Sequence, residues 1–344
     1  MFMLEHQFSR REFLQRAGII TGGVILGNSC NDLQYPQLKD QILLKPLQNL
    51  YNIYGIHDTP NIGGSNNLLL FEQDIWRLKP QWMTFTSPSS RLLRFSHTAN
   101  LSVISRIYQK DNKFNSQLIR NETVKAFEFI KDPVFVPFNE VNLLEETGGI
   151  SLSPEEHIYN HFLPTVDLIS EIANNFQKRA QILITPLAQR APEVHGLDEK
   201  TYFIKILQSL RPYLDKFNCD FSLGFHAYIF EEDEDPLKYI KDRYILAQNI
   251  FNVNLPIYVT EGGLHQTVNK NFSEKVVAKQ TGMILKTIIP DDLPIKAYIL
   301  WLLSNYVQRP KEHRNKILDD YEQAAFRKLT GTTETYEEIA TLAS

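Results

Sequence analysis

The sequence has little cysteine and little excess charge. Cys30 and Cys219 are the two cysteines among 344 residues, too few to form a zinc cluster by themselves, and they indicate no disulfide framework. The net charge is -4, so the chain lacks the basic footprint of a protein that binds nucleic acid. Apolar material is plentiful instead: 43% of the residues are hydrophobic and 11% aromatic, which is enough for a large globular core.

The apolar run near the N-terminus is short. It covers 11 residues, 17–27, whereas a membrane-spanning helix needs about 20. This length suits the hydrophobic region of an export signal. The preceding stretch S-R-R-E-F-L at 9–14 resembles a twin-arginine signal, whose paired arginines (here Arg10 and Arg11) direct a folded protein to the twin-arginine export machinery. Glycines within the run disfavour the alternative, an amphipathic N-terminal helix.

Cys30 directly follows this run, as in a lipoprotein signal. Gly27 stands three residues before it, where such signals usually carry a branched apolar residue, so the sequence leaves lipidation of Cys30 open. We expect residues 1–30 to form a signal peptide and 31–48 a linker. The protein is then expected to be bacterial and extracytoplasmic, in the periplasm or at the cell surface. Its contact with the membrane would be through the signal or a lipid on Cys30.

Beyond residue 48, short apolar or β-branched runs alternate with longer segments of helical period. This alternation is typical of βαβ units and a parallel sheet. The clearest helix is expected at 154–176, where Ser153, Pro154 and Glu156 have the pattern of a capping box, and another is expected at 199–214. Strands are expected at 51–57, 82–86, 101–108, 134–138, 181–185, 221–226, 256–260 and 297–301.

Eight strands alternating with helices predict a (β/α)8 TIM barrel over 49–331. A final helix or C-terminal tail without chemistry is expected at 332–344. No stretch of linker composition divides the chain between 50 and 330. The alternative is a doubly wound open sheet, which usually has a glycine-rich phosphate turn after its first strand. Here the first strand ends G-I-H-D-T-P at 55–60, which disfavours the open sheet.

Polar and aromatic residues gather where the predicted strands end. All strand C-termini of a barrel open on one face, and active sites lie there. Two carboxylates, Glu140 and Glu261, are therefore expected on one rim. The other strand-end residues are His57, Asp58, Arg106, Tyr108, Asn139, His226, Tyr228 and Trp301.

Two carboxylates across a cleft suit the cleavage of a glycosidic bond. One of them must be protonated, in order to donate to the leaving oxygen. The other must be ionised, in order to attack the anomeric carbon or to direct a water to it. Their surroundings have to push the two pKa values apart.

The arrangement resembles the clan A glycoside hydrolases, and the resemblance covers nearly the whole barrel. F-N-E at 138–140 is similar to the asparagine–glutamate pair that closes the fourth strand in that clan. This match implies that Glu140 is the acid/base and that Asn139 binds the sugar 2-hydroxyl. Glu261 falls at the end of the seventh strand, where the clan has its nucleophile.

Two further elements resemble the clan. H-A-Y at 226–228 looks like the H-x-Y element of family 5, which implies that His226 and Tyr228 lie at the substrate, with Tyr228 on the nucleophile. Trp301 matches the tryptophan that stacks on the sugar at the end of the eighth strand.

Two features depart from the clan. Val141 follows the asparagine–glutamate pair, where members often have proline. The arginine near the nucleophile has no secure counterpart; Arg106, Arg94 and Arg91 are candidates, and the strand position favours Arg106. These departures put the exact family and substrate in doubt.

We therefore expect an exported O-glycosidase that acts on an oligo- or polysaccharide by a retaining double displacement. The reaction needs no metal and no organic cofactor, because the acid, the nucleophile and the binding platform are side chains. One alternative is a non-catalytic carbohydrate-binding barrel of the cell envelope, and a weaker one is a lyase or isomerase. The expected catalytic residues are Glu140 and Glu261, and the expected substrate-binding residues are Asn139, His226, Tyr228, Trp301, Arg106 and His57.

Two other patterns are expected to carry no chemistry. His157 and His161 lie four residues apart on a predicted helix, as two metal ligands can, but the H-E-x-x-H order is missing. The acidic run E-E-D-E-D at 231–235 lacks the glycine of a calcium-binding loop. We expect structural or surface histidines and a solvated loop.

Overall fold

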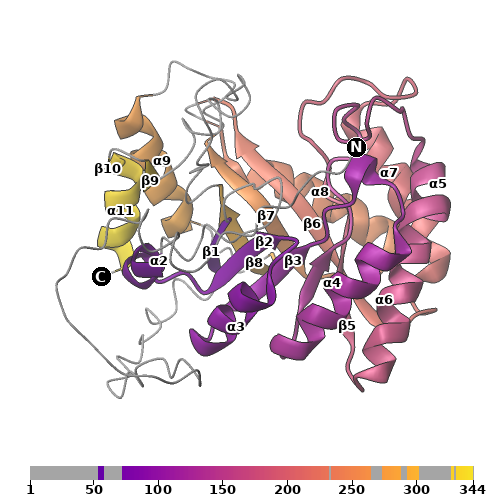
Figure 1. Cartoon of the computed structure of the whole chain (residues 1–344). Helices are drawn as coiled ribbons and strands as arrows, with labels where there is room; N and C mark the ends of the chain where they lie inside the picture. The colour runs from indigo at the N-terminus through magenta and orange to yellow at the C-terminus, as the bar shows by residue number, and fades with distance from the viewer. Residues whose placement is uncertain are drawn as a thin grey trace, which may run out of the picture. The chain divides into compact units, whose positions relative to one another are not determined.

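A closed barrel of eight parallel strands forms the centre of the molecule (Figure 1). Each strand pairs with its neighbours in chain order, and β8 closes the ring on β1. This computed structural model describes residues 53–57, 72–231, 234–264, 273–287, 293–301, 327–328 and 331–343. The predicted (β/α)8 barrel is confirmed and the open sheet is excluded. The expected signal and linker, 1–48, lie outside the described residues.

The strands lie where the sequence predicts them, with differences at their ends. The largest differences are in β6 and β7, which pair beyond the predicted limits, as far as Ile229 with Leu264. Gly262 and Gly263 therefore lie inside β7, and the strand continues past Glu261. The strands are β1 Tyr54–His57, β2 Trp82–Thr86, β3 Ser102–Arg106, β4 Val134–Val136, β5 Ala180–Ile184, β6 Cys219–Ile229, β7 Ile257–Leu264 and β8 Ile295–Leu300, with a separate small pair, β9 Arg327–Lys328 and β10 Gly331–Thr332.

Helices connect the strands on the outside of the barrel. The helix predicted at 154–176 begins with the expected capping box, in which Ser153 and Glu156 bond reciprocally. It is not one regular helix, because a π-helical stretch separates its first turn from the rest. The helical elements are α2 Glu72–Leu78, α3 Ser90–Thr98, η2 Lys110–Asn112, α4 Ser116–Phe129, α5 Pro154–Glu156, η3 His157–Phe162, α6 Leu163–Asn175, α7 Glu199–Leu210, η4 Arg211–Tyr213, α8 Pro236–Phe251, α9 Glu274–Thr287 and α11 Glu334–Ala343.

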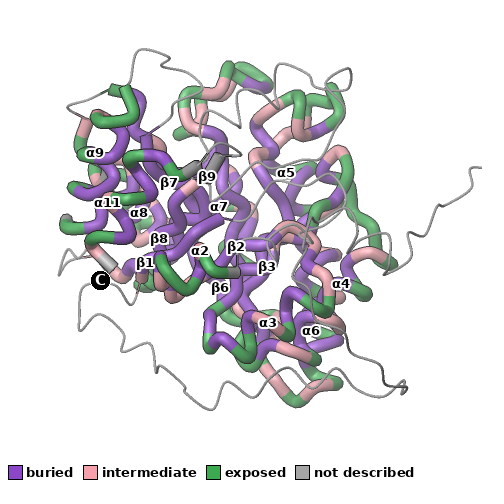
Figure 2. Tube along the Cα trace, turned by 60° about the vertical axis from the view of Figure 1, so that its left-hand side comes forward, coloured by how far each residue is buried: buried purple, intermediate pink, exposed green. Residues whose placement is uncertain are grey.

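The apolar core has two layers, because successive strand residues point alternately into and out of the barrel. In β4, Phe135 packs in the outer layer, between the strands and the helices, whereas Val134 and Val136 pack inside the barrel. Trp82 and Tyr258 meet edge to face inside, with ring centroids 5.6 Å apart. The strands are accordingly almost wholly buried (Figure 2). The barrel interior is thus a packed core that closes the site from below.

The segment expected as a final helix or tail forms helix α11, which packs against α9 and α2. Tyr336 is fully buried, and its hydroxyl donates to Asp74 Oδ1 at 2.7 Å. Arg77 of α2 pairs with Glu337 at 2.6 Å. Helix α11 is therefore part of the ring of helices around the barrel. No helix in the described ranges is long and apolar enough to cross a membrane.

We expect Gly262→Ala to lower the free energy of unfolding by about 1–3 kcal/mol, the usual cost of overpacking a core. A Cβ at Gly262 would lie 2.7 Å from Cε1 of the Tyr298 ring, and that ring is fully buried and cannot move away cheaply. Urea denaturation measures the change. Gly282→Ala, in α9, is the matched control: there the Cβ meets the end of the flexible Glu338 side chain of α11, so equal or greater stability is expected. Equal loss in both variants would contradict the argument.

Candidate active site

A bulge in β7 points the Glu261 side chain into the mouth of the barrel. Tyr258 points into the barrel and Val259 outward, so strict alternation would point Glu261 outward as well. The pairing with β6 shifts by one residue, however: Val259 lies opposite Phe225, and Glu261 lies opposite His226. Thr260 is the extra residue of this bulge, and extra residues of this kind commonly re-aim a side chain next to an active site.

Glu261 lies among donors from several strands. Arg106 Nη1, at the end of β3, is 3.0 Å from Glu261 Oε1, and the Tyr228 hydroxyl of β6 donates to Oε2 at 2.7 Å. The Nε2 atoms of His226 and His57 lie 3.6 and 4.0 Å from Oε1. The Glu261 side chain is 8% exposed, so these contacts act where water screens little.

The surroundings of Glu261 favour its ionised form. Burial alone would raise its pKa, and this is the largest single influence. The positive charges of His226, Arg106 and His57, together with the hydrogen bond from Tyr228, outweigh burial and lower the pKa below its ordinary value. A buried glutamate that stays ionised is suited to act as a nucleophile.

Glu140 follows β4 in a strained backbone conformation. Its φ is 43°, in the left-handed region that costs a non-glycine residue about 1–2 kcal/mol. Two hydrogen bonds hold it there: the Glu140 N–H donates to Pro186 O at 3.0 Å, and Glu140 O accepts from Leu143 N at 2.8 Å. Its side chain is 17% exposed. The second carboxylate is therefore held on the rim by its own backbone geometry.

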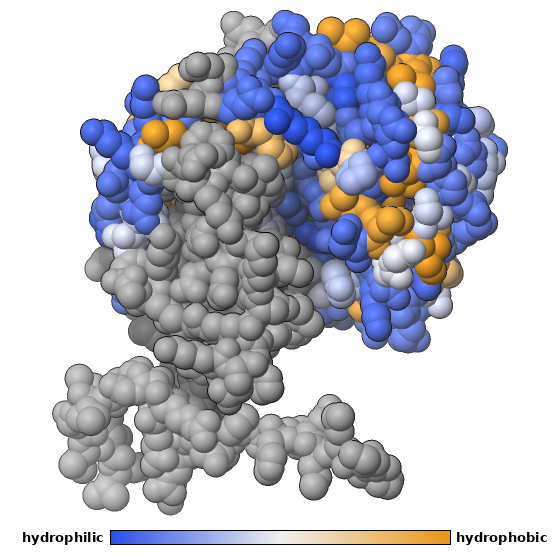
Figure 3. Space-filling view, turned by 90° about the horizontal axis from the view of Figure 1, so that it is seen from above, coloured by the Kyte–Doolittle hydropathy of each residue, from blue (hydrophilic) through white to orange (hydrophobic). Residues whose placement is uncertain are grey.

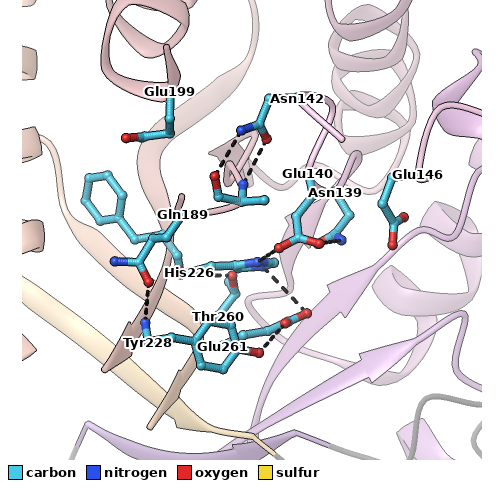
Figure 4. Close-up of polar contacts among 12 residues, drawn as sticks. Asn139, Glu140, Asn142, Glu146, Gln189, Glu199, His226, Tyr228, Thr260 and Glu261 are labelled. Carbon is cyan, nitrogen blue, oxygen red and sulfur yellow. Dashed lines mark hydrogen bonds and ion pairs between the residues drawn. The ribbon is translucent and has the colours of Figure 1, made fainter. Parts of the chain in front are cut away.

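His226 lies between the two glutamates (Figure 4). Its Nδ1 is 2.8 Å from Glu140 Oε1 and its Nε2 is 3.6 Å from Glu261 Oε1. Burial would lower the pKa of His226, but the charges of Glu261 and Glu140 outweigh burial and raise it. When His226 is protonated, its two ring nitrogens can donate toward the two carboxylates, one toward each.

Asn139 is buried beside Glu140, with its Nδ2 3.5 Å from Glu140 Oε2. Asn112, in η2, clamps its backbone: Asn112 Oδ1 accepts from Asn139 N at 3.2 Å, and Asn112 Nδ2 donates to Asn139 O at 2.6 Å. Gln109 Nε2 donates to Pro137 O at 2.8 Å, just before this pair. The loop after β3 thus fixes the loop after β4 that carries Glu140.

Trp301 and His57 complete the mouth. Trp301 follows β8, and its ring centroid is 4.5 Å from that of His57, at an interplanar angle of 59°. The backbone N–H of Trp301 donates to Gly262 O at 3.0 Å, which ties Trp301 to the strand that carries Glu261. Because His57 contacts both the Trp301 ring and Glu261, it links the tryptophan to the residues around Glu261.

The structure brings all eight predicted site residues together in one group of contacts. Of the three arginines considered, Arg106 contacts Glu261, whereas Arg94 of α3 lies over the ring of Phe129, 5.3 Å from its centroid. Seen from the side on which the strands end, this face carries both hydrophilic and hydrophobic side chains (Figure 3).

Sequence reasoning missed the residues that hold the site. Asn142 exchanges two hydrogen bonds with the Ala188 backbone, at 2.9 and 2.8 Å, and Gln189 Oε1 accepts from Tyr228 N at 2.6 Å. It also missed Glu146, whose Oε2 lies 3.9 Å from Arg106 Nη2. These residues lie in loops after strands, and no local pattern distinguishes them from other loop polar residues.

The histidine pair His157 and His161 and the acidic run at 231–235 were expected to carry no chemistry, and members of both contact other side chains. His157 is fully buried, its Nε2 is 2.9 Å from Thr185 Oγ1, and burial lowers its pKa to about 3. No group of three or more potential metal ligands occurs among the described residues. In the acidic run, Glu231 and Glu234 both pair with Arg190, at 3.5 and 3.4 Å; residues 232–233 lie outside the described part of the chain.

No protein-family model and no curated protein sequence matches the chain. Among solved structures, a GH128 (subgroup II) endo-beta-1,3-glucanase from Sorangium cellulosum has a TM-score of 0.56 and 12% identity, covering 85% of this chain and 98% of that chain. A glucosidase from Croceicoccus marinus has a TM-score of 0.58 and 8% identity, over 87% and 68% of the two chains. A family 51 alpha-L-arabinofuranosidase from Bifidobacterium longum has a TM-score of 0.51 and 12% identity, over 84% and 70%. At such identities these likenesses show the barrel fold alone.

Proposed function

We propose that the protein is a retaining glycoside hydrolase, with Glu261 as nucleophile and Glu140 as acid/base. The observation that carries this proposal is the pair of carboxylates at the barrel mouth, one after β4 and one within β7, both in contact with His226. The pKa of Glu261 is lowered, as a nucleophile requires. The Glu140 side chain is 17% exposed, against 8% for Glu261, which suits a group that must exchange a proton with water in the second step.

The proposed reaction has two steps. In the first, Glu261 attacks the anomeric carbon while Glu140 protonates the leaving oxygen, and a glycosyl enzyme forms. In the second, Glu140 removes a proton from water, which attacks the same carbon and releases Glu261. Arg106 and Tyr228 aim the nucleophile through their contacts with its two oxygens. Asn139 would bind the 2-hydroxyl, and Trp301 would stack against the sugar.

Two readings compete with this proposal. A carbohydrate-binding barrel would have no need of a buried ionised glutamate, which is costly unless it is paired. A lyase or isomerase would use Glu140 and Glu261 as acid and base, and its base would be expected to have a pKa closer to neutrality. The lowered pKa of Glu261 favours nucleophilic attack over both.

Turnover of a panel of aryl glycosides, with the anomeric configuration of the first product recorded by NMR, tests the proposal. Laminari-oligosaccharides belong in the panel, because structures of a similar GH128 enzyme from Amycolatopsis mediterranei contain laminaritriose. We expect hydrolysis with retention. Binding of a sugar without turnover would favour the binding protein, an unsaturated or isomerised product would favour the other enzymes, and inversion would exclude the double displacement.

We further propose that the protein is exported by the twin-arginine route, on the strength of S-R-R-E-F-L at 9–14 and the apolar run that follows. Replacing Arg10 and Arg11 with lysine is expected to leave the protein in the cytoplasm, as cell fractionation and immunoblotting would show. Undiminished export of the double variant would exclude this route. Cys30→Ala tests lipidation separately, because a lipid anchor is lost with the cysteine.

A further inference from the structure

A third carboxylate, Glu146, reaches the proposed nucleophile through Arg106. The two ends of the Arg106 guanidinium face two different glutamates: Nη1 is 3.0 Å from Glu261 Oε1, and Nη2 is 3.9 Å from Glu146 Oε2. Arg106 is 12% exposed and Glu146 is 31% exposed. One arginine therefore bridges a buried carboxylate and a carboxylate at the open side of the mouth (Figure 4 shows the two glutamates).

The backbone of Glu146 is held by the clamp that holds the catalytic loop. Asn112 Nδ2 donates to Glu146 O at 3.1 Å and to Asn139 O at 2.6 Å. Gly148 has a φ of 66°, and a Cβ there would lie 2.6 Å from the Asp111 side chain, so this loop packs closely on η2. Glu146 is thus fixed relative to Asn139 and Glu140.

We propose that Glu146 is a positioning residue for the reaction, which holds Arg106 against Glu261 and places a third negative charge beside the two catalytic carboxylates. This inference rests on the proposed function. A guanidinium is planar and presents its donors in a rigid fork, so a partner on Nη2 restricts the direction in which Nη1 can point. Without Glu146, Arg106 would have fewer constraints on its approach to Glu261.

The charge of Glu146 acts on its neighbours as theirs acts on it. Burial raises the pKa of Glu146; the Arg106 charge lowers it, and the charges of Glu140 and Glu261 raise it further. The same repulsion acts in return on Glu261, where the charge of Glu146 opposes the groups that lower the pKa. The charged groups that face Glu146 are Arg106 of β3, Glu140 after β4, His226 of β6 and Glu261 of β7, and Asp111 of η2 packs against the same loop.

Glu146→Gln removes this charge and keeps the size of the side chain. The acidic limb of the pH profile of kcat/KM reports ionisation of Glu261, and the alkaline limb reports loss of the Glu140 proton. We expect both limbs to move to lower pH, by about half a unit to one unit for a charge at this range. At a fixed pH on the alkaline limb, kcat/KM should fall by up to about tenfold for that shift, mainly through kcat.

Glu145→Gln is the matched control, because it makes the same change one residue earlier, at an exposed carboxylate of the same loop. The pH profile of kcat/KM for Glu145→Gln should have both limbs at the same pH as in the wild type. Glu146→Asp, which keeps the charge on a shorter side chain, should keep the limbs near those of the wild type. Thermal denaturation checks that each variant is folded at the temperature of the assay.

A second readout needs no turnover. NMR titration of the His226 ring should give a lower midpoint in Glu146→Gln than in the wild type, and no change in Glu145→Gln, because a negative charge has been taken away from a nearby cation. If wild-type protein cleaves no glycoside, the proposed function fails while this titration still decides the inference. The proposed role of Glu146 would be overturned if Glu146→Gln changed neither the limbs of the kcat/KM pH profile nor the midpoint of the His226 titration, even if kcat fell. A change in KM alone would also overturn it.

Discussion

Glu261→Gln is expected to abolish turnover of every glycoside that the wild type cleaves, with a loss in kcat of about 10⁴-fold or more, as for removal of a covalent nucleophile. The amide has the size of the carboxylate but cannot attack the anomeric carbon. The amide of the variant also has only one acceptor oxygen, whereas the Glu261 carboxylate accepts from Arg106 on one oxygen and from Tyr228 on the other. Single-turnover kinetics with an activated aryl glycoside would measure the loss, since no glycosyl enzyme should form.

Tyr228→Phe is the control for this experiment, because it removes one hydrogen bond to Glu261 and leaves the nucleophile in place. A partial loss of kcat is expected from it. If Glu261→Gln lost no more activity than Tyr228→Phe, Glu261 would be a supporting residue and the double displacement would need another nucleophile.

The same variant should change how stability depends on pH. The pKa of Glu261 is lowered in the folded protein. Its carboxylate therefore stabilises the fold above the pKa of an unfolded glutamate, about 4.3, and this contribution is lost as the pH falls through the lowered folded value. Urea denaturation at a series of acidic pH values measures this effect. As the pH falls below the pKa of the unfolded glutamate, the free energy of unfolding should decrease less steeply in Glu261→Gln than in the wild type.

The fold was predictable because its signals are local. Residues 82–86 are a short run of apolar and β-branched residues and form β2 with the same bounds. The capping box at Ser153 and Glu156 depends on residues three apart, so it can be recognised without the rest of the chain. The π-helical stretch at His157–Phe162 was not predictable in this way, because the apolar stripe of the sequence continues through it.

The site was predictable in its members but not in how they are aimed. Strand order and strand ends were enough to bring Glu140 and Glu261 to one rim. The bulge at Thr260 depends on the register between β7 and its partner strands, and register is a property of the pair that one strand's sequence does not report. The same reason hid Asn112, whose partner Asn139 is 27 residues away.

Glu140→Ala is expected to give a different defect, one that depends on the leaving group. On a glycoside with a poor leaving group, kcat/KM should fall by about 10²–10⁴-fold, the usual contribution of general acid catalysis. On an activated aryl glycoside the leaving group needs no proton, so Glu261 should still attack, and a burst of phenol should precede a slow steady state. Mass spectrometry of the stalled protein would detect the glycosyl enzyme.

Azide should rescue this stalled variant, because it is a nucleophile that needs no general base. The product should be a glycosyl azide of retained configuration, since azide attacks the face opposite the bond to Glu261, and this second inversion restores the configuration of the substrate. Glu261→Gln forms no glycosyl enzyme, so the same concentration of azide should not give that product. His226 contacts both glutamates, and with Glu140 removed it keeps only its contact with Glu261. The pKa of His226 should then fall, because one of the two negative charges that raise it has gone. A Glu140→Ala variant that turned over both classes of substrate at the wild-type rate, with no response to azide, would show that Glu140 is not the acid/base.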